Sequence, residues 1–224
     1  MDTIQPPPVS EPALEALRAR IDALDDRIIQ LICDRMAVIA EVAALKNSQN
    51  AARCHIRSGR EGQMHRRIAA AFANSDFPPL AALAIWRQLI SAASHREAPL
   101  HITSAAPAHL ARDYFGSFVT HHNTANALAA LSEVAAAQAT IAVIPPSGLA
   151  ALARFPALKI FAALPLSGRS IEALAVAEIT PEPSGEDVSY FLSTEGKVET
   201  IAGFVRETSP GALWLGAHPQ QLKL

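Results

Sequence analysis

A long apolar stripe near the N-terminus, broken at a single position, constrains this chain more than any other feature. No proline or glycine occurs between Ala13 and Lys46, and the residues spaced alternately three and four apart are apolar with one exception. They are Leu14, Leu17, Ile21, Leu24, Ile28, Leu31, Arg35, Val38, Val42 and Leu45. The pattern predicts one continuous helix of about 50 Å, at ~1.5 Å per residue. A compact domain of this size cannot cover such a helix, so we expect it to pack against a second copy of the chain.

Two further helices are predicted before Pro99, where the helical pattern of the sequence gives way to short β-rich runs. The first runs from about Ser58 to Ala73, and the second begins near Leu80 after a turn at Phe77–Pro79. The second helix carries an apolar stripe that ends in a charge, formed by Leu83, Trp86, Ile90, Ala93 and Glu97. We therefore expect an all-α, three-helix N-terminal domain that forms an intertwined dimer.

From Pro99 onward, short β-rich runs alternate with alanine-rich stretches, which predicts a small α/β domain with a partly parallel sheet. The expected strands are Leu100–Ser104, Ser117–Thr120, Thr140–Ile144, Leu158–Leu164, Ile171–Ala177 and Ser189–Ser193. The expected helices are Pro107–Tyr114 and Asn123–Gln138. Together with the proline-rich start, this gives a disordered leader at residues 1–10, a helical domain at 11–98 and an α/β domain at 99–224.

Composition narrows the class of protein. The net charge of −2 offers no basic footprint for nucleic acid, and no uncharged run approaches the ~20 apolar residues of a membrane span. The N-terminus lacks the cationic and apolar regions of a secretory signal, so a cytoplasmic protein with two free thiols is expected. The eight histidines show no metal-ligand spacing, and Gly148 and Gly168 stand in isolated turns. We expect neither a metal nor a nucleotide.

The cations of the first helix suggest an anionic ligand. Arg35 and Lys46 are three turns apart on one side of the helix, and Arg18 lies 17 residues before Arg35, about 26 Å along the axis. One small ligand cannot reach both arginines of one chain, whereas two antiparallel helices in a dimer would bring them together. A buried arginine in an apolar seam needs an anionic partner. That partner is either a ligand or an acidic neighbour, such as Asp25, Asp26, Asp34 or Glu41.

These residues resemble a known family. Leu17-Arg18, Ile21, Leu24-Asp25, Leu31, Arg35 and Lys46 are similar to the first helix of the all-helical (type II) chorismate mutases. The segment Arg57–Glu61, followed by Met64–Ile68, resembles the start of the family's second helix, and Ile85–Ile90 resembles part of its third. The resemblance covers about Leu14 to Glu97. Three positions depart from the pattern. Arg57 stands where an acidic residue is common, Ala93 where a small hydroxyl residue is common, and Glu97 where many members have glutamine.

The resemblance implies an enzyme that converts chorismate to prephenate and needs no cofactor. The partner subunit's Arg18, together with Arg35, would hold the substrate carboxylates, and Lys46 and a protonated Glu97 would donate to the ether oxygen. Glu61 would accept a hydrogen bond from the ring hydroxyl, and Arg60 would help to neutralise the ring side. Two alternatives stay open: an isochorismate pyruvate lyase on the same scaffold, and a noncatalytic dimer that senses a metabolite.

The α/β part carries a weaker resemblance. Thr140–Pro145 resembles a strand of the prephenate dehydratase and periplasmic-binding-protein type of fold. However, Val188–Leu192 lacks the Thr-Arg-Phe motif that dehydratases carry at such a strand. We therefore expect a noncatalytic binding or structural domain, whose ligand the sequence does not identify.

Overall fold

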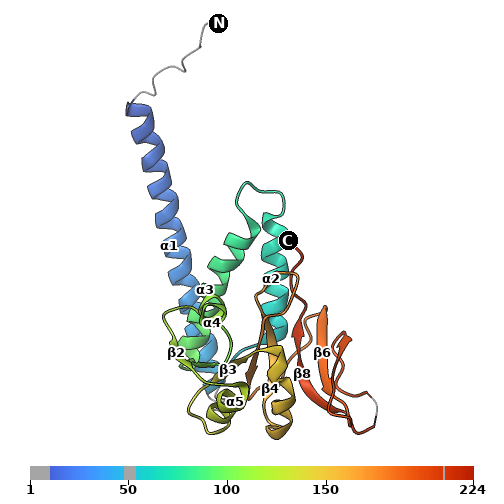
Figure 1. The fold of residues 1–224 in the computed structure, drawn as a ribbon. Helices are drawn as coiled ribbons and strands as arrows, with labels where there is room; N and C mark the ends of the chain where they lie inside the picture. Colours follow the sequence, from blue (N-terminus) through green and yellow to red (C-terminus); the bar gives the residue numbers. More distant parts are fainter. Residues whose placement is uncertain (1–10, 48–53, 209) are drawn as a thin grey trace, which may run out of the picture. The chain divides into compact units, whose positions relative to one another are not determined.

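The computed structural model describes residues 11–47, 54–208 and 210–224 (Figure 1). The predicted leader at residues 1–10 lies outside the described residues. The chain divides into two compact units, one that contains the first helix and one that contains everything from residue 54 on. Each unit is described by itself below.

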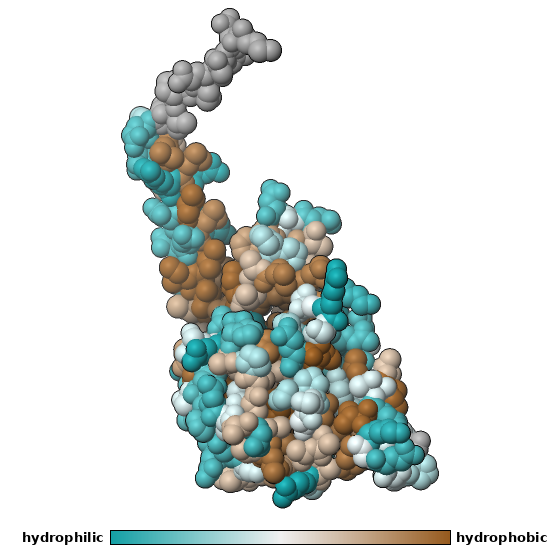
Figure 2. Space-filling view, in the orientation of Figure 1, coloured by the Kyte–Doolittle hydropathy of each residue, from teal (hydrophilic) through white to brown (hydrophobic). Residues whose placement is uncertain are grey.

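The first unit is a single helix, α1 (Glu11–Asn47), of 37 residues and about 55 Å. Its predicted continuity is confirmed. The apolar stripe is open to solvent: the exposed fraction is 57% for Ile21, 54% for Ile28 and 65% for Leu31. Figure 2 shows hydrophobic surface at several levels along the helix. A lone helix with such a stripe would gain free energy by packing against another apolar surface.

The second unit begins with two helices, α2 (Ser58–Phe72) and α3 (Pro79–Glu97), which pack through Ile68, Ala69, Ala82 and Leu83. Leu222, near the end of the chain, packs against the same cluster. The two helices therefore share one compact unit with the sheet. The sequence suggests a domain boundary at residue 98, whereas the two compact units of the structure meet before α2.

An eight-stranded mixed sheet forms the rest of this unit, in the order β2-β1-β3-β5-β4-β8-β6-β7. β1 pairs in parallel with both β2 and β3, and β5 joins β3 and β4 antiparallel to each. The strand bounds are β1 (His101–Ser104), β2 (Thr120–Asn123), β3 (Ile141–Ile144), β4 (Lys159–Leu164), β5 (Ala173–Ala177), β6 (Asp187–Leu192), β7 (Val198–Ala202) and β8 (Leu213–Pro219).

Both faces of the central strands are covered. β3 and β5 are buried at every position, as their continuous apolar runs require. On one face Ile102, Val143 and Ala175 pack with Leu110 and Phe115 of α4 (Ala108–Phe115). The other face packs against α5 (Ala127–Ala135) and the 3₁₀ helix η1 (Pro146–Arg154). The predicted α/β character of this region is confirmed.

Several predicted elements differ from the structure in position or number. The expected strand at Ser117–Thr120 lies three residues later, as β2, because Gly116 to Phe118 are used to leave α4. Strands β7 and β8 and helix η1 were not expected. β7 is an exposed edge strand, and among the described residues it pairs with β6 alone. It therefore lacks the apolar signal of a buried strand. No helix in the described part of the chain has the length and apolarity to cross a membrane.

Candidate functional site

The predicted site residues fall in both units. Arg18 is on α1, where it is exposed and forms ion pairs with Glu15 and, at 3.8 Å, with Glu11. Arg35 is half-buried in the same helix and has an interaction partner, and Lys46 belongs to the last turn of α1. Arg60 and Glu61 begin α2, and Glu97 is the last residue of α3. We predicted that these residues surround one ligand. Because they belong to two different units, that arrangement stays a prediction.

Arg60 and Glu61 face different surroundings. Consecutive helical residues are rotated by about 100° around the axis, so neighbours cannot both face one partner squarely. Arg60 is exposed, whereas Glu61 is only 8% exposed. Arg60 therefore lies on the open side of the helix and Glu61 on the packed side.

The partner of Glu61 is Arg87 of α3. Arg87 Nη1 donates to Glu61 Oε2 at 2.5 Å, and the Arg87 residue is 1% exposed. Its guanidinium also lies over the ring of Tyr114, 4.2 Å from the centroid. Burial alone would lower the pKa of Arg87, but the charge of Glu61, the interaction with Tyr114 and the hydrogen bond to Glu61 together outweigh burial, and the pKa is raised. The two side chains thus form a buried ion pair.

Arg87 also belongs to a set of side chains that cap the end of α4. The last carbonyls of a helix have no partner within it. Here Gln88 Nε2 donates to the carbonyl of Asp113 at 3.2 Å, and Arg87 Nε donates to that of Tyr114 at 2.9 Å. Ser91 Oγ donates to the carbonyl of Phe115. Three residues on one side of α3 therefore fasten α4 to the helical pair, and a cation at a helix C-terminus is electrostatically favourable.

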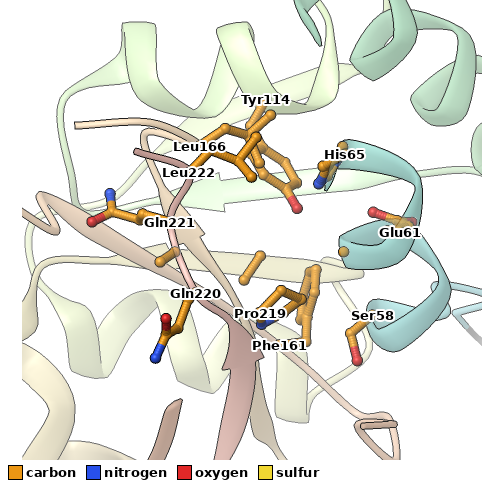
Figure 3. A pocket seen from close by; sticks show the side chains of 13 residues that line it. Ser58, Glu61, His65, Tyr114, Phe161, Leu166, Pro219, Gln220, Gln221 and Leu222 are labelled. Carbon is orange, nitrogen blue, oxygen red and sulfur yellow. The ribbon is translucent and has the colours of Figure 1, made fainter. Parts of the chain in front are cut away.

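A small cavity borders this cluster, with Ser58, Glu61 and His65 of α2 on one side and the segment Pro219–Leu222 on another (Figure 3). Its volume is about 20 Å³, enough for one water molecule but not for a ring-sized ligand. Burial, followed by the charges of Arg87 and Arg66, lowers the pKa of His65 to about 3, so His65 is neutral near pH 7. Burial raises the pKa of Tyr114.

Consequently, this arrangement gives Glu61 no access to a substrate hydroxyl. Its carboxylate is bound by Arg87, and the cavity beside it is water-sized. The hydroxyl-accepting role predicted for Glu61 would need this pair to open.

Arg57, which departs from the family pattern, also has a partner within the unit. Its Nε lies 3.2 Å from both carboxylate oxygens of Glu182, in the segment between β5 and β6. The same segment donates from the amide of Glu182 to Ser58 Oγ at 3.2 Å. The start of α2 is therefore held by the α/β part of the chain. Among the described residues, no group of three or more His, Cys, Asp or Glu side chains is placed to hold a metal ion.

Comparison with known families supports the resemblance of the N-terminal region. The family model of chorismate mutase type II matches residues 17–98. This mutase segment, as residues 17–98 are called below, makes up a little over a third of the chain. It contains most of α1 together with α2 and α3. The resemblance predicted for about Leu14 to Glu97 is confirmed from residue 17 onward. No curated protein and no solved structure gives a significant match.

Sequence reasoning missed Arg87, His65 and Tyr114. A signal for Arg87 was present, because it follows Leu83 by four residues and precedes Ile90 by three, on the buried stripe of α3. His65 likewise follows Glu61 by four residues on the buried face of α2. Nothing in the sequence pairs Arg87 with Glu61, because that pairing depends on how two helices dock.

Proposed function

We propose that this chain is a chorismate mutase that rearranges chorismate to prephenate. The observation that carries the proposal is the match of residues 17–98 to the chorismate mutase type II family. Support comes from α1, a single 37-residue helix that bears Arg18, Arg35 and Lys46 at the spacings expected for that family. We keep residue 98 as the C-terminal limit of the functional mutase segment.

The proposed chemistry needs positioning and charge rather than a nucleophile. The rearrangement is intramolecular, so the protein has to select the compact conformer of chorismate and stabilise the negative charge that grows on the ether oxygen. Arginine side chains suit the two carboxylates, because the guanidinium fork matches a carboxylate. In this proposal Lys46 and a protonated Glu97 donate to the ether oxygen, and Arg60, exposed on α2, neutralises the ring side.

We further propose that the active protein is a homodimer with shared sites. Arg18 and Arg35 are about 26 Å apart along α1, too far for one small substrate to touch both. The exposed stripe of α1 offers an apolar surface for a second copy. An antiparallel pair of α1 helices would place the partner subunit's Arg18 near Arg35.

One observation favours a second candidate, a noncatalytic dimer on the same scaffold. Glu61, the residue expected to hold the ring hydroxyl, is bound by Arg87 in a closed, water-sized environment. If the mutase segment does not catalyse a reaction, Glu61 is not needed for a substrate and can remain bound to Arg87. This candidate predicts binding of a metabolite without turnover.

Turnover of purified full-length protein separates the candidates. Chorismate should disappear and prephenate should accumulate, and Arg35→Ala should lower kcat/KM by about 10²-fold or more because a charge-assisted contact is lost. Arg27→Ala is the matched control, because Arg27 is an exposed arginine of α1 outside the apolar seam. Binding of chorismate without turnover would overturn the mutase proposal. Release of pyruvate from isochorismate, with no prephenate from chorismate, would indicate the lyase instead.

A further inference from the structure

One side of α2 lies against the α/β part of the chain at very short range. Gly59 and Gly62 are three residues apart and therefore share a side of the helix. A Cβ added to Gly59 would lie 2.4 Å from the carbonyl oxygen of Pro183, and one added to Gly62 would lie 2.4 Å from Cγ of Pro219. Glycine is a poor helix former, so this close approach is the physical reason for two glycines in one helix.

Polar contacts join the same side of α2 to residues 181–186, which lie between β5 and β6 and are called the β5–β6 loop below. Arg66, four residues after the second glycine, donates from Nη1 to Ser184 Oγ at 3.4 Å and from Nη2 to the carbonyl of Ser184. At the start of the helix, Arg57 pairs with Glu182 of the same loop. The loop therefore holds α2 along about two and a half turns.

The β5–β6 loop is itself held in place. Asp187, which is 2% exposed at the start of β6, accepts through Oδ2 from the amides of Ser184 at 2.9 Å and Gly185 at 3.2 Å. Ser184 Oγ donates to the carbonyl of Glu186 at 3.0 Å, and that carbonyl also accepts from the amide of Gln220 at 2.9 Å. The loop is thus fastened to the sheet and to the C-terminal segment, and it offers α2 a fixed surface.

We propose that the β5–β6 loop positions α2, and with it Arg60, for catalysis, a role that rests on the proposed mutase function. Arg60 is exposed on the open side of α2, within the stretch that the loop holds. The position of the helix therefore sets the position of the Arg60 guanidinium. A displacement of about 1 Å in a group that orients or stabilises the reacting molecule can cost about 10²-fold in rate. The mutase segment carries the groups that contact substrate, and the α/β part supplies the surface that places one of them.

Gly59→Ala in the full-length chain tests this positioning. The added Cβ has to move from 2.4 Å to an ordinary contact of at least 3.4 Å from the Pro183 oxygen, so α2 and the loop must separate by about 1 Å. The kcat/KM for chorismate, per folded protein, should fall by about 10²-fold. Arg60→Ala should lower it at least as far. In the Arg60→Ala background, Gly59→Ala should lower it by a further factor of less than about three, because the loop acts through Arg60.

Arg66→Ala is a second test, which adds no volume to the contact. It removes the donors to Ser184 and should lower kcat/KM by about tenfold. Arg66→Lys keeps a charged donor and should regain most of that loss. Arg67→Ala is the matched control, because it removes the same charge from the next residue, which is exposed, and it should leave kcat/KM unchanged.

Urea denaturation establishes that each variant is folded before its kinetics are compared. The positioning role is overturned if folded Gly59→Ala converts chorismate like the unaltered chain, or if it costs the same factor with and without Arg60. It is also overturned if Arg66→Ala and Arg67→Ala have equal effects, and this comparison decides the matter if Gly59→Ala does not fold. In each of these cases the unaltered chain still converts chorismate, so the mutase proposal stands. If the unaltered chain does not convert chorismate, both proposals fall.

Discussion

Glu61→Gln removes the charge that balances Arg87 while keeping the shape of the side chain. Side-chain exposure is 2% for Arg87 and 9% for Glu61, so water cannot replace the lost carboxylate. Removing one member of a buried ion pair costs about 3–5 kcal/mol, a large part of the roughly 5–15 kcal/mol that stabilises a typical domain. We therefore expect the free energy of unfolding to fall by about 3–5 kcal/mol.

Urea denaturation followed by tryptophan fluorescence measures this loss in the right unit, because both tryptophans, Trp86 and Trp214, lie in the second unit. The matched control is Glu182→Gln, which breaks the Arg57–Glu182 pair. These side chains are 55% and 39% exposed, so that pair should contribute less than about 1 kcal/mol. If Glu61→Gln costs no more than Glu182→Gln, the buried pair described here is wrong.

Three further predictions concern pH, packing and catalysis. The pKa of His65 is about 3 in the folded chain, below its ordinary value of 6.5, so the unfolded chain binds the proton first as pH falls. The contribution of buried, neutral His65 to the free energy of unfolding should be fully present above pH 6.5, and the free energy should be lower by about 2–3 kcal/mol at pH 4.5. His65→Phe should remove that difference between the two pH values, as measured by urea titration at each. Gly62→Ala should destabilise the chain by about 1–3 kcal/mol despite better helix propensity, because an added Cβ would lie 2.4 Å from Pro219 Cγ; a higher melting temperature would contradict this packing. If Glu97 donates to the ether oxygen as an acid, Glu97→Gln should flatten the alkaline decline of kcat/KM, whereas identical profiles would remove Glu97 from the proposed site.

The helices were predictable because each has a local cause. The long apolar stripe of α1 needs no tertiary information, and the Phe77–Pro79 turn separates α2 from α3. Strand β3 was also predictable, because a short continuous run of apolar residues is typical of a strand that is buried on both faces.

Strand β8 was missed because Gly216 resembles a turn residue in sequence. In the sheet it has a φ of +130°, and a Cβ there would lie 2.4 Å from the backbone nitrogen of Ile160 on β4. The glycine is thus required by a close strand approach, which only the tertiary structure reveals.

The candidate site was predictable only in part. The cations of α1 follow from spacing and from the family resemblance, but the environment of Glu61 does not. Its neighbour Arg60 offers an obvious local partner, whereas the observed partner, Arg87, lies 26 residues away on another helix. Long-range docking of α2 and α3 on the sheet decides which charges meet.

Subunit mixing tests the central claim most directly. Arg18→Ala and Arg35→Ala chains should each be nearly inactive in the conversion of chorismate to prephenate. After equal mixing and verified exchange, half of the dimers are mixed and one of the two sites in each keeps both arginines, so about a quarter of the unaltered activity should return. Absence of any recovery, or full activity of either single variant, would contradict a chorismate mutase with arginines shared between two α1 helices.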